Sequence, residues 1–131
     1  MKILLDTHTI IWFIDGNLSL SKKCRELIVD MDNEIYVSCI SLFEMAIKIK
    51  LNKLELNSSL DAFIEKVISE DINILPLSNS HIIFYSQIPF FDNHRDPFDR
   101  MLIATSAVEN MPIISFDKQF SNYNDIINVI Y

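Results

Sequence analysis

Glycine is nearly absent from this chain, because Gly16 is the one glycine among 131 residues. A single glycine cannot build the glycine-rich loops that hold the phosphates of dinucleotides, so domains of that class are excluded. Cysteine is scarce as well. Cys24 and Cys39 show neither a CxxC motif nor the spacing of metal ligands, and we expect both to be reduced core residues of a cytoplasmic protein.

Long apolar runs and an excess of basic residues are also lacking. No apolar run approaches the length that spans a bilayer, and Asp6 comes too early for a secretory signal peptide, so we expect no contact with a membrane. Eighteen acidic and eleven basic residues give a formal charge of −7. Proteins that hold nucleic acid by phosphate contacts alone are usually basic. Nucleic-acid binding would therefore need bound divalent cations to offset the acids.

Half of the residues are hydrophobic, and we expect residues 1–131 to form a single domain. The segments predicted to be strands are 3–5, 34–38, 72–75, 112–115 and 126–130. Three of the predicted helices are 7–15, 41–51 and 97–109. A further helix is capped by Ser19 or Ser21 and ends near 31, another runs from the turn 57–59 to about 70, and Ser80 opens a short one. Residues 88–95 are predicted to form a loop, and residues 117–120 a turn. This alternation predicts an α/β fold with a mainly parallel central sheet of about five strands, covered by helices on both faces.

Acidic residues follow the predicted strands. Asp6 comes directly after the first strand, Glu44 a few residues after the second, and Asp117 after the fourth. Asp96 and Asp99 open the helix that leads into the fourth strand. Ligands of open parallel sheets bind at the carboxyl ends of the strands. We therefore expect these acidic side chains to meet at one edge of the sheet.

Carboxylates gathered in one pocket raise one another's pKa values unless a cation lies between them. Their oxygen atoms are suitable ligands for Mg²⁺ or Mn²⁺, and one or two such ions support phosphodiester hydrolysis. Each acid also has a capping interpretation. Asp6 and Asp96 are candidate N-caps, Ser41-x-x-Glu44 has the form of a capping box, and Asp117 is a candidate turn residue. A cap and a metal ligand are compatible roles, because a carboxylate has two oxygens.

Four segments in this chain carry a family pattern. They are Leu4-Leu5-Asp6-Thr7-His8 with Trp12 downstream, Ser41-Leu42-Phe43-Glu44, His94-Arg95-Asp96-Pro97-Phe98-Asp99-Arg100 leading into Leu102-Ile103-Ala104, and Ser115-Phe116-Asp117 before Phe120. In this order they resemble a PIN domain, and in particular the toxins of type II toxin–antitoxin pairs, often called VapC. The resemblance covers essentially the whole chain, and the segment 96–104 is its most specific part.

The resemblance implies a three-layer α/β/α fold and an endoribonuclease that depends on Mg²⁺ or Mn²⁺. It also implies a homodimer and inhibition by an antitoxin protein. Carried over to this sequence, Asp6, Glu44 and Asp99 are the core metal ligands and catalytic residues, and Asp117 completes the set. Asp96 is a fifth candidate ligand, with helix capping as its alternative.

Further residues near these acids are candidates for binding the RNA substrate. The hydroxyls of Thr7 and Ser115 are candidates to position a ligand or a phosphate. Arg100 is a candidate for phosphate contact, with a salt bridge to Asp96 or another helix neighbour as its alternative. His8 and His94 are candidates to touch RNA or a partner. The lysines after Glu44 form either a solvated helix face or a rim that guides RNA; they are Lys48, Lys50 and Lys53.

Two rival interpretations involve other chemistry or none. In a haloacid-dehalogenase-type phosphatase, the aspartate that ends the first strand is the nucleophile, and a second aspartate normally follows two residues later. This chain has His8 at that place, which argues against such a phosphatase. The second rival is a PIN fold that has lost catalysis and acts only as a protein-binding module. The intact acids argue against this second alternative, but the sequence alone does not exclude it. A test of metal-dependent RNA cleavage would distinguish it from a nuclease.

Overall fold

Five short hydrophobic segments form one parallel sheet in the computed structural model, which describes residues 1–91 and 93–131. The strands are β1 (Lys2–Leu5), β2 (Glu34–Ser38), β3 (Asn73–Leu75), β4 (Ile113–Ile114) and β5 (Val129–Ile130). Their order in the sheet is β3-β2-β1-β4-β5, and all four pairings are parallel. The central strand β1 therefore delivers Asp6, the next residue, to the middle of the carboxyl edge.

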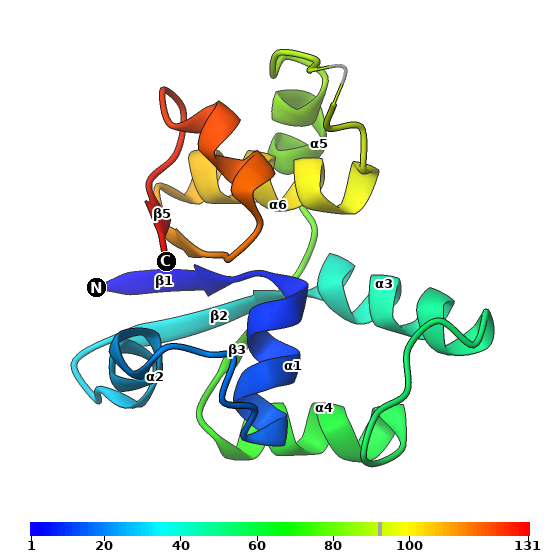
Figure 1. Ribbon diagram of the computed structural model, residues 1–131. Coiled ribbons are helices and arrows are strands. Elements are labelled where there is room, and N and C mark those ends of the chain that lie inside the picture. Colours follow the sequence, from blue (N-terminus) through cyan, green and yellow to red (C-terminus); the bar gives the residue numbers. More distant parts are fainter. Residues whose placement is uncertain (92) are drawn as a thin grey trace.

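Helices cover both faces of this sheet. They are α1 (Thr7–Asp15), α2 (Lys22–Val29), α3 (Cys39–Lys50), α4 (Leu60–Ser69), α5 (Asn79–Tyr85), α6 (Pro97–Glu109) and the 3₁₀ helix η1 (Lys118–Tyr123). In Figure 1, α1, α2 and α4 lie below the sheet, α5 and α6 lie above it, and α3 extends beyond the carboxyl end of β2. The predicted three-layer α/β/α fold is confirmed.

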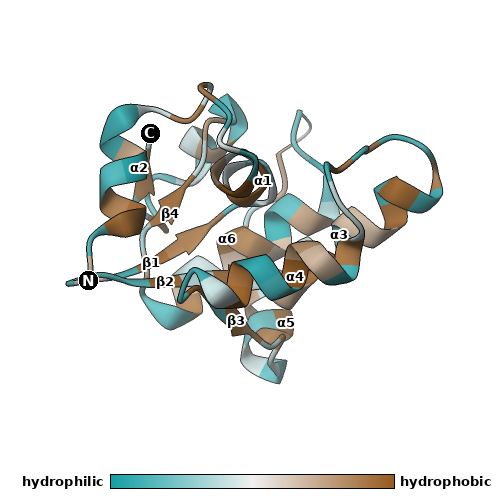
Figure 2. Ribbon diagram, turned by 90° about the horizontal axis from the view of Figure 1, so that it is seen from below, coloured by the Kyte–Doolittle hydropathy of each residue, from teal (hydrophilic) through white to brown (hydrophobic). Residues whose placement is uncertain are grey.

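The hydrophobic core is divided by the sheet, because successive side chains of a strand point to opposite faces. Ile3 and Leu5 belong to the core under α1, α2 and α4, whereas Leu4 belongs to the core shared with α6 and η1. In β4, Ile114 joins the first core and Ile113 the second. Figure 2 shows β1 and β4 in the brown of hydrophobic residues. Near-continuous hydrophobic runs are what strands covered on both faces require.

The start of α3 differs from the prediction. This helix begins at Cys39 because the Ser38 hydroxyl accepts a hydrogen bond from the backbone N–H of Ile40, at 3.1 Å. Ser41 and Glu44 therefore lie inside the helix, and the capping-box interpretation of Glu44 is wrong. The carboxylate of Glu44 is left available for contacts with neighbouring elements.

Other predicted boundaries are confirmed or shift by a few residues. Ser21 caps α2, as one of the two predicted candidates. The helix α5 begins at Asn79 rather than Ser80, because Ser78 and His81 form a reciprocal capping box. The strand β5 is shorter than predicted, since the N–H of Ile126 donates to the carbonyl of Tyr123 in a turn instead of joining the sheet. The predicted loop 88–95 includes residue 92, which lies outside the described residues.

Two smaller expectations concern the cysteines and the membrane. Cys24 is buried, Cys39 is half-buried, and both are free thiols, as predicted. None of the helices in the described part of the chain combines the length and the apolar character needed to cross a bilayer.

The core around α4 gives a stability prediction. Phe63 is 1% exposed, whereas Phe43 on α3 is 57% exposed. We expect Phe63→Ala to lower the free energy of unfolding by about 3–5 kcal/mol, because it removes buried surface and leaves a cavity. Phe43→Ala should lower that free energy by no more than about 1.5 kcal/mol, because this mostly exposed ring loses only its edge-to-face contact with Phe98. Chemical denaturation of both variants tests this, and equal effects would contradict the burial of Phe63.

Candidate metal centre

Asp6 is placed by the end of β1 and the beginning of α1. It caps α1, and its Oδ1 accepts a hydrogen bond from the N–H of Thr9 at 2.8 Å. The side chain is buried. Burial raises the pKa of Asp6, although hydrogen bonds from Ser115 and Thr9 act in the opposite direction. The predicted capping role is therefore present, and Ser115 lies beside this carboxylate.

Glu44 lies within α3 with both carboxylate oxygens engaged. Its Oε1 accepts a hydrogen bond from the Thr7 hydroxyl at 2.7 Å, and its Oε2 lies 2.7 Å from the Nζ of Lys48. The Thr7 hydroxyl oxygen is also 3.0 Å from that of Ser41. The hydrogen bond to Glu44 raises the pKa of Lys48, and the charges of Asp96 and Asp99 raise it further. Thr7 and Lys48 thus fix the position of a buried carboxylate.

Asp96 is the N-cap of α6, as one of its two predicted roles required. Its Oδ1 accepts hydrogen bonds from the N–H groups of Phe98 at 2.9 Å and Asp99 at 3.2 Å. Pro97 occupies the first position of the helix, where a missing N–H does no harm. This cap determines how Asp99, one turn into the helix, faces the other acids.

The carboxyl group of Asp99 shows how closely the acids gather. Its pKa rises from 3.8 to about 8. Burial is the largest cause, and the negative charges of Asp96, Glu44, Asp117 and Asp6 follow in that order. Acids from four separate parts of the chain therefore act on one carboxyl group. Without a cation, this group holds a proton at neutral pH.

Asp117 follows β4 and caps η1, where its Oδ1 accepts a hydrogen bond from the N–H of Gln119 at 2.9 Å. His94, Asp99 and Asp117 each offer one ligand atom, and these three atoms lie within 4.8 Å of one another. One histidine nitrogen and two hard carboxylate oxygens suit a divalent cation. Together with the raised pKa of Asp99, this grouping shows that the residues present fit such an ion.

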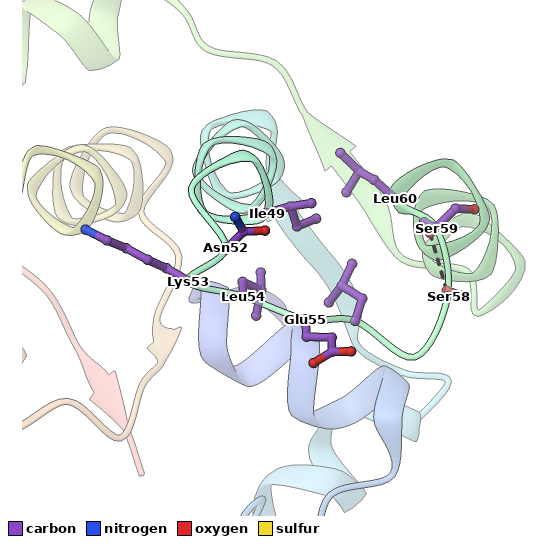
Figure 3. A pocket seen from close by; sticks show the side chains of 9 residues that line it. Ile49, Asn52, Lys53, Leu54, Glu55, Ser58, Ser59 and Leu60 are labelled. Carbon is purple, nitrogen blue, oxygen red and sulfur yellow. Dashed lines mark hydrogen bonds between the residues drawn. The ribbon is translucent and has the colours of Figure 1, made fainter.

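An open cavity of about 270 Å³ adjoins these acids. It is lined by Asp6, His8, Trp12, Phe116 and Asp117. The rings of Trp12 and Phe116 are 5.6 Å apart and tilted. A larger cavity of about 630 Å³ lies between the end of α3 and the start of α4, and all of its described lining residues come from 49–60 (Figure 3). That cavity contains none of the predicted metal ligands, although Lys53, a candidate for guiding RNA, lies in its lining.

The family assignment follows from a comparison with known protein families. The family model of the PIN domain matches residues 3–126. The chain belongs to the PIN-domain family. A search of curated proteins found no match to this chain.

Solved structures similar to this PIN-domain protein include complexes of toxins with antitoxins. A chain in DNA-bound VapBC from Salmonella typhimurium has a TM-score of 0.71 at 19% identity, with 99% of this chain and 97% of that chain covered. A chain in VapBC2 from Rickettsia felis, bound to a promoter DNA fragment, has a TM-score of 0.68 at 15% identity and covers 99% and 98%. FitAcB from Neisseria gonorrhoeae gives 0.65 at 19% identity, covering 98% and 96%. At these identities the likeness shows the fold.

His94 contributes more to this PIN-domain site than the sequence indicated. It is buried, with Nε2 at 3.2 Å from Oδ2 of Asp99 and Nδ1 at 2.8 Å from the hydroxyl of Tyr123. Burial lowers the pKa of His94. A hydrogen bond between Nε2 of His94 and Oδ2 of Asp99 needs one proton, which either the neutral imidazole or the carboxyl group supplies, depending on the tautomer of His94. His94 begins one of the four segments that carry the family pattern, which was a signal for this role, whereas nothing in the sequence marked Tyr123.

Arg100 takes a structural position instead of facing the acids. Its guanidinium is buried and donates to the carbonyls of Pro89 at 2.9 Å and Ile88 at 3.4 Å, and to the hydroxyl of Tyr123 at 3.1 Å. These partners argue against both predicted roles, phosphate contact and a salt bridge to Asp96 or another helix neighbour. They join the start of the 88–95 loop to α6 and hold Tyr123 against His94.

The pKa of Asp99 predicts how the stability of the metal-free protein depends on pH. Because the pKa is about 8 in the folded protein and 3.8 in the unfolded chain, the folded state binds the proton more tightly between these values. The contribution of Asp99 to stability is therefore fully present below pH 3.8 and is lost as the pH rises to about 8.

We expect Asp99→Asn to flatten this dependence and to stabilise the metal-free protein. Each unit of pKa shift corresponds to about 1.4 kcal/mol, so the gain at pH 8 should be at least about 2 kcal/mol. Denaturant unfolding with a chelator present, at about pH 5 and at pH 8, measures it. Asp61→Asn, at an exposed position on α4, is the matched control. A variant no more stable than wild type at pH 8 would contradict the raised pKa of Asp99 that burial and the neighbouring acids produce.

Proposed function

We propose that this PIN-domain protein is an endoribonuclease that depends on Mg²⁺ or Mn²⁺. The observation that supports the proposal most is the grouping of His94, Asp99 and Asp117, whose ligand atoms lie within 4.8 Å of one another, with the charges of three further acids acting on Asp99. Such an arrangement is unfavourable for a folded protein unless it holds a cation or a proton. Acids collected at the carboxyl edge of a parallel sheet also lie where ligands of such sheets bind.

The proposed ligands are Asp6, Glu44, Asp99 and Asp117, with Asp96 as a further candidate. When bound, a divalent cation supplies the positive charge that holds a phosphate and lowers the pKa of an attacking water molecule. The other polar groups of the site keep the carboxylates in place. Thr7 orients Glu44, Ser115 supports Asp6, and His94 holds Asp99.

The acidic charge of the protein supports a role for the cation in substrate binding. With a formal charge of −7, the chain as a whole repels a polyanion. A bound cation reverses the sign of the field where the scissile phosphate has to dock. RNA as the substrate is proposed from the resemblance to the VapC toxins. The hydroxyls of Thr7 and Ser115 are buried beside Glu44 and Asp6, so we assign them to positioning these ligands and not to contacting the phosphate.

We further propose that the protein is the toxin of a type II toxin–antitoxin pair. Similar solved structures are described as VapBC complexes, some bound to DNA, and as FitAB bound to a DNA fragment. They support an antitoxin protein as the partner that blocks the site. A homodimer and a cytoplasmic location belong to the same proposal.

Cleavage of RNA by purified protein tests the activity. We expect cleavage with Mn²⁺ or Mg²⁺ at internal positions of some member of a panel of tRNA, rRNA fragments and mRNA. Asp6→Asn should lower the cleavage rate by at least about 100-fold, because it removes a charged ligand at the centre of the edge. Asp61→Asn, which removes the same charge at an exposed position, should leave the rate unchanged.

Failure of the wild-type protein to cut any RNA with either cation would contradict the nuclease and favour the inactive protein-binding module. Residual cleavage by Asp6→Asn close to the wild-type rate would show that the activity comes from another site or from a contaminant. Cleavage of DNA in preference to RNA would agree with the proposed metal site but would contradict RNA as the substrate.

Removal of the cation should leave a folded but inactive protein. The two hydrophobic cores are formed by apolar side chains and include none of the proposed ligands, so we expect the fold to persist without the ion. We expect the far-ultraviolet circular dichroism spectrum to be unchanged by a chelator that abolishes cleavage. Unfolding by the chelator would instead indicate a structural metal.

A further inference from the structure

The ion pair between Glu44 and Lys48 differs from an ordinary pair on a helix surface. The same four-residue spacing occurs in α2, where Lys22 and Glu26 are 3.7 Å apart and have side chains that are 90% and 65% exposed. Exposed pairs of this kind contribute little. In α3 the separation is 2.7 Å, and the Glu44 side chain is only 4% exposed. A buried carboxylate needs a counter-charge, and Lys48 provides it.

The ammonium group of Lys48 also lies within the influence of the other acids. Besides Glu44, the charges of Asp96 and Asp99 act on it. The helices α3 and α6, which carry these residues, pack against each other, with the rings of Phe43 and Phe98 in edge-to-face contact. Lys48 therefore brings a positive charge into the acidic cluster from its α3 side.

Both oxygens of Glu44 are occupied in this arrangement, Oε1 by Thr7 and Oε2 by Lys48. A cation bound at Oε2 would compete with the ammonium group of Lys48 for the negative charge of this oxygen. The Lys48 side chain is 36% exposed and reaches the cluster by a flexible stem, so it can swing into solvent without disturbing the core. The ammonium group of Lys48 and a divalent cation are thus alternative partners of the same carboxylate oxygen of Glu44.

We propose that Lys48 is the internal counter-ion of the metal centre, a positioning residue that holds Glu44 in the metal-free protein and competes with a divalent cation for it. The proposal rests on the proposed function, since it takes Glu44 to be a ligand of that cation. Lys48 lowers the affinity for the ion and keeps the buried carboxylate paired when no ion is bound. The cluster is thereby kept in a binding geometry in both states.

Titration of the full-length protein with Mn²⁺, followed by calorimetry without RNA, tests the proposal. Lys48→Met keeps the length and the apolar stem but removes the charge, and it should raise the affinity for Mn²⁺ about tenfold. Lys48→Arg restores the charge and should bind Mn²⁺ with near wild-type affinity. Lys50→Met removes the same charge from an exposed position of the same helix and should change the affinity less than about twofold, because solvent and salt screen it.

A second measurement uses thermal unfolding with and without Mn²⁺. Lys48→Met should unfold at a lower temperature than Lys50→Met in the presence of a chelator, and saturating Mn²⁺ should remove that difference. Equal Mn²⁺ affinities of the two methionine variants, or a weaker affinity of Lys48→Met, would overturn the role of Lys48 while leaving the metal centre intact. A wild-type protein that binds no Mn²⁺ would overturn the metal centre and the counter-ion together.

Discussion

Repulsion between carboxylates at the carboxyl edge of the sheet is the constraint on which the rest of the site depends. The parallel strands end at one edge, and the chain places an acid after β1, an acid within α3, and an acid after β4. The helix α6 adds Asp96 and Asp99 at its first turn. Burial raises the pKa of Asp99, and repulsion from the other acids raises it further, to about 8. Acids gathered at this edge are stable only when positive charge or protons lie close to them.

The surrounding groups stabilise these acids by donating hydrogen bonds or by supplying positive charge. Thr7 and Lys48 donate to Glu44, and the N–H groups at the start of α6 donate to Asp96. His94 contacts Asp99 and is itself held by Tyr123. These contacts keep the acids oriented. The capping roles of Asp6, Asp96 and Asp117 are thus compatible with cation binding, because each cap uses Oδ1.

The sequence predicted the architecture well because local signals determine it. Alternating apolar and amphipathic segments gave the parallel sheet, and the Asp96-Pro97 pair gave the start of α6. Contacts between distant residues were less accessible. The sequence pattern allowed a capping box as the alternative to metal binding for Glu44, and it assigned Arg100 to phosphate contact or to a salt bridge with Asp96 or another helix neighbour. The partners of both are chosen by tertiary packing: Thr7 lies on a different helix, and Tyr123 lies on η1. Burial likewise turned His94 from a peripheral candidate into a neighbour of Asp99.

Diffraction from crystals grown with Mn²⁺, with data collected at the manganese absorption edge, tests the central claim most directly. The account predicts an anomalous peak at the carboxyl edge of the sheet, within about 2.0–2.4 Å of carboxylate oxygens of Asp99 and of at least one other of the four proposed ligands. A peak elsewhere on the molecule would contradict the claim that these acids gather to hold a cation. The absence of any peak at saturating Mn²⁺ would contradict it as well.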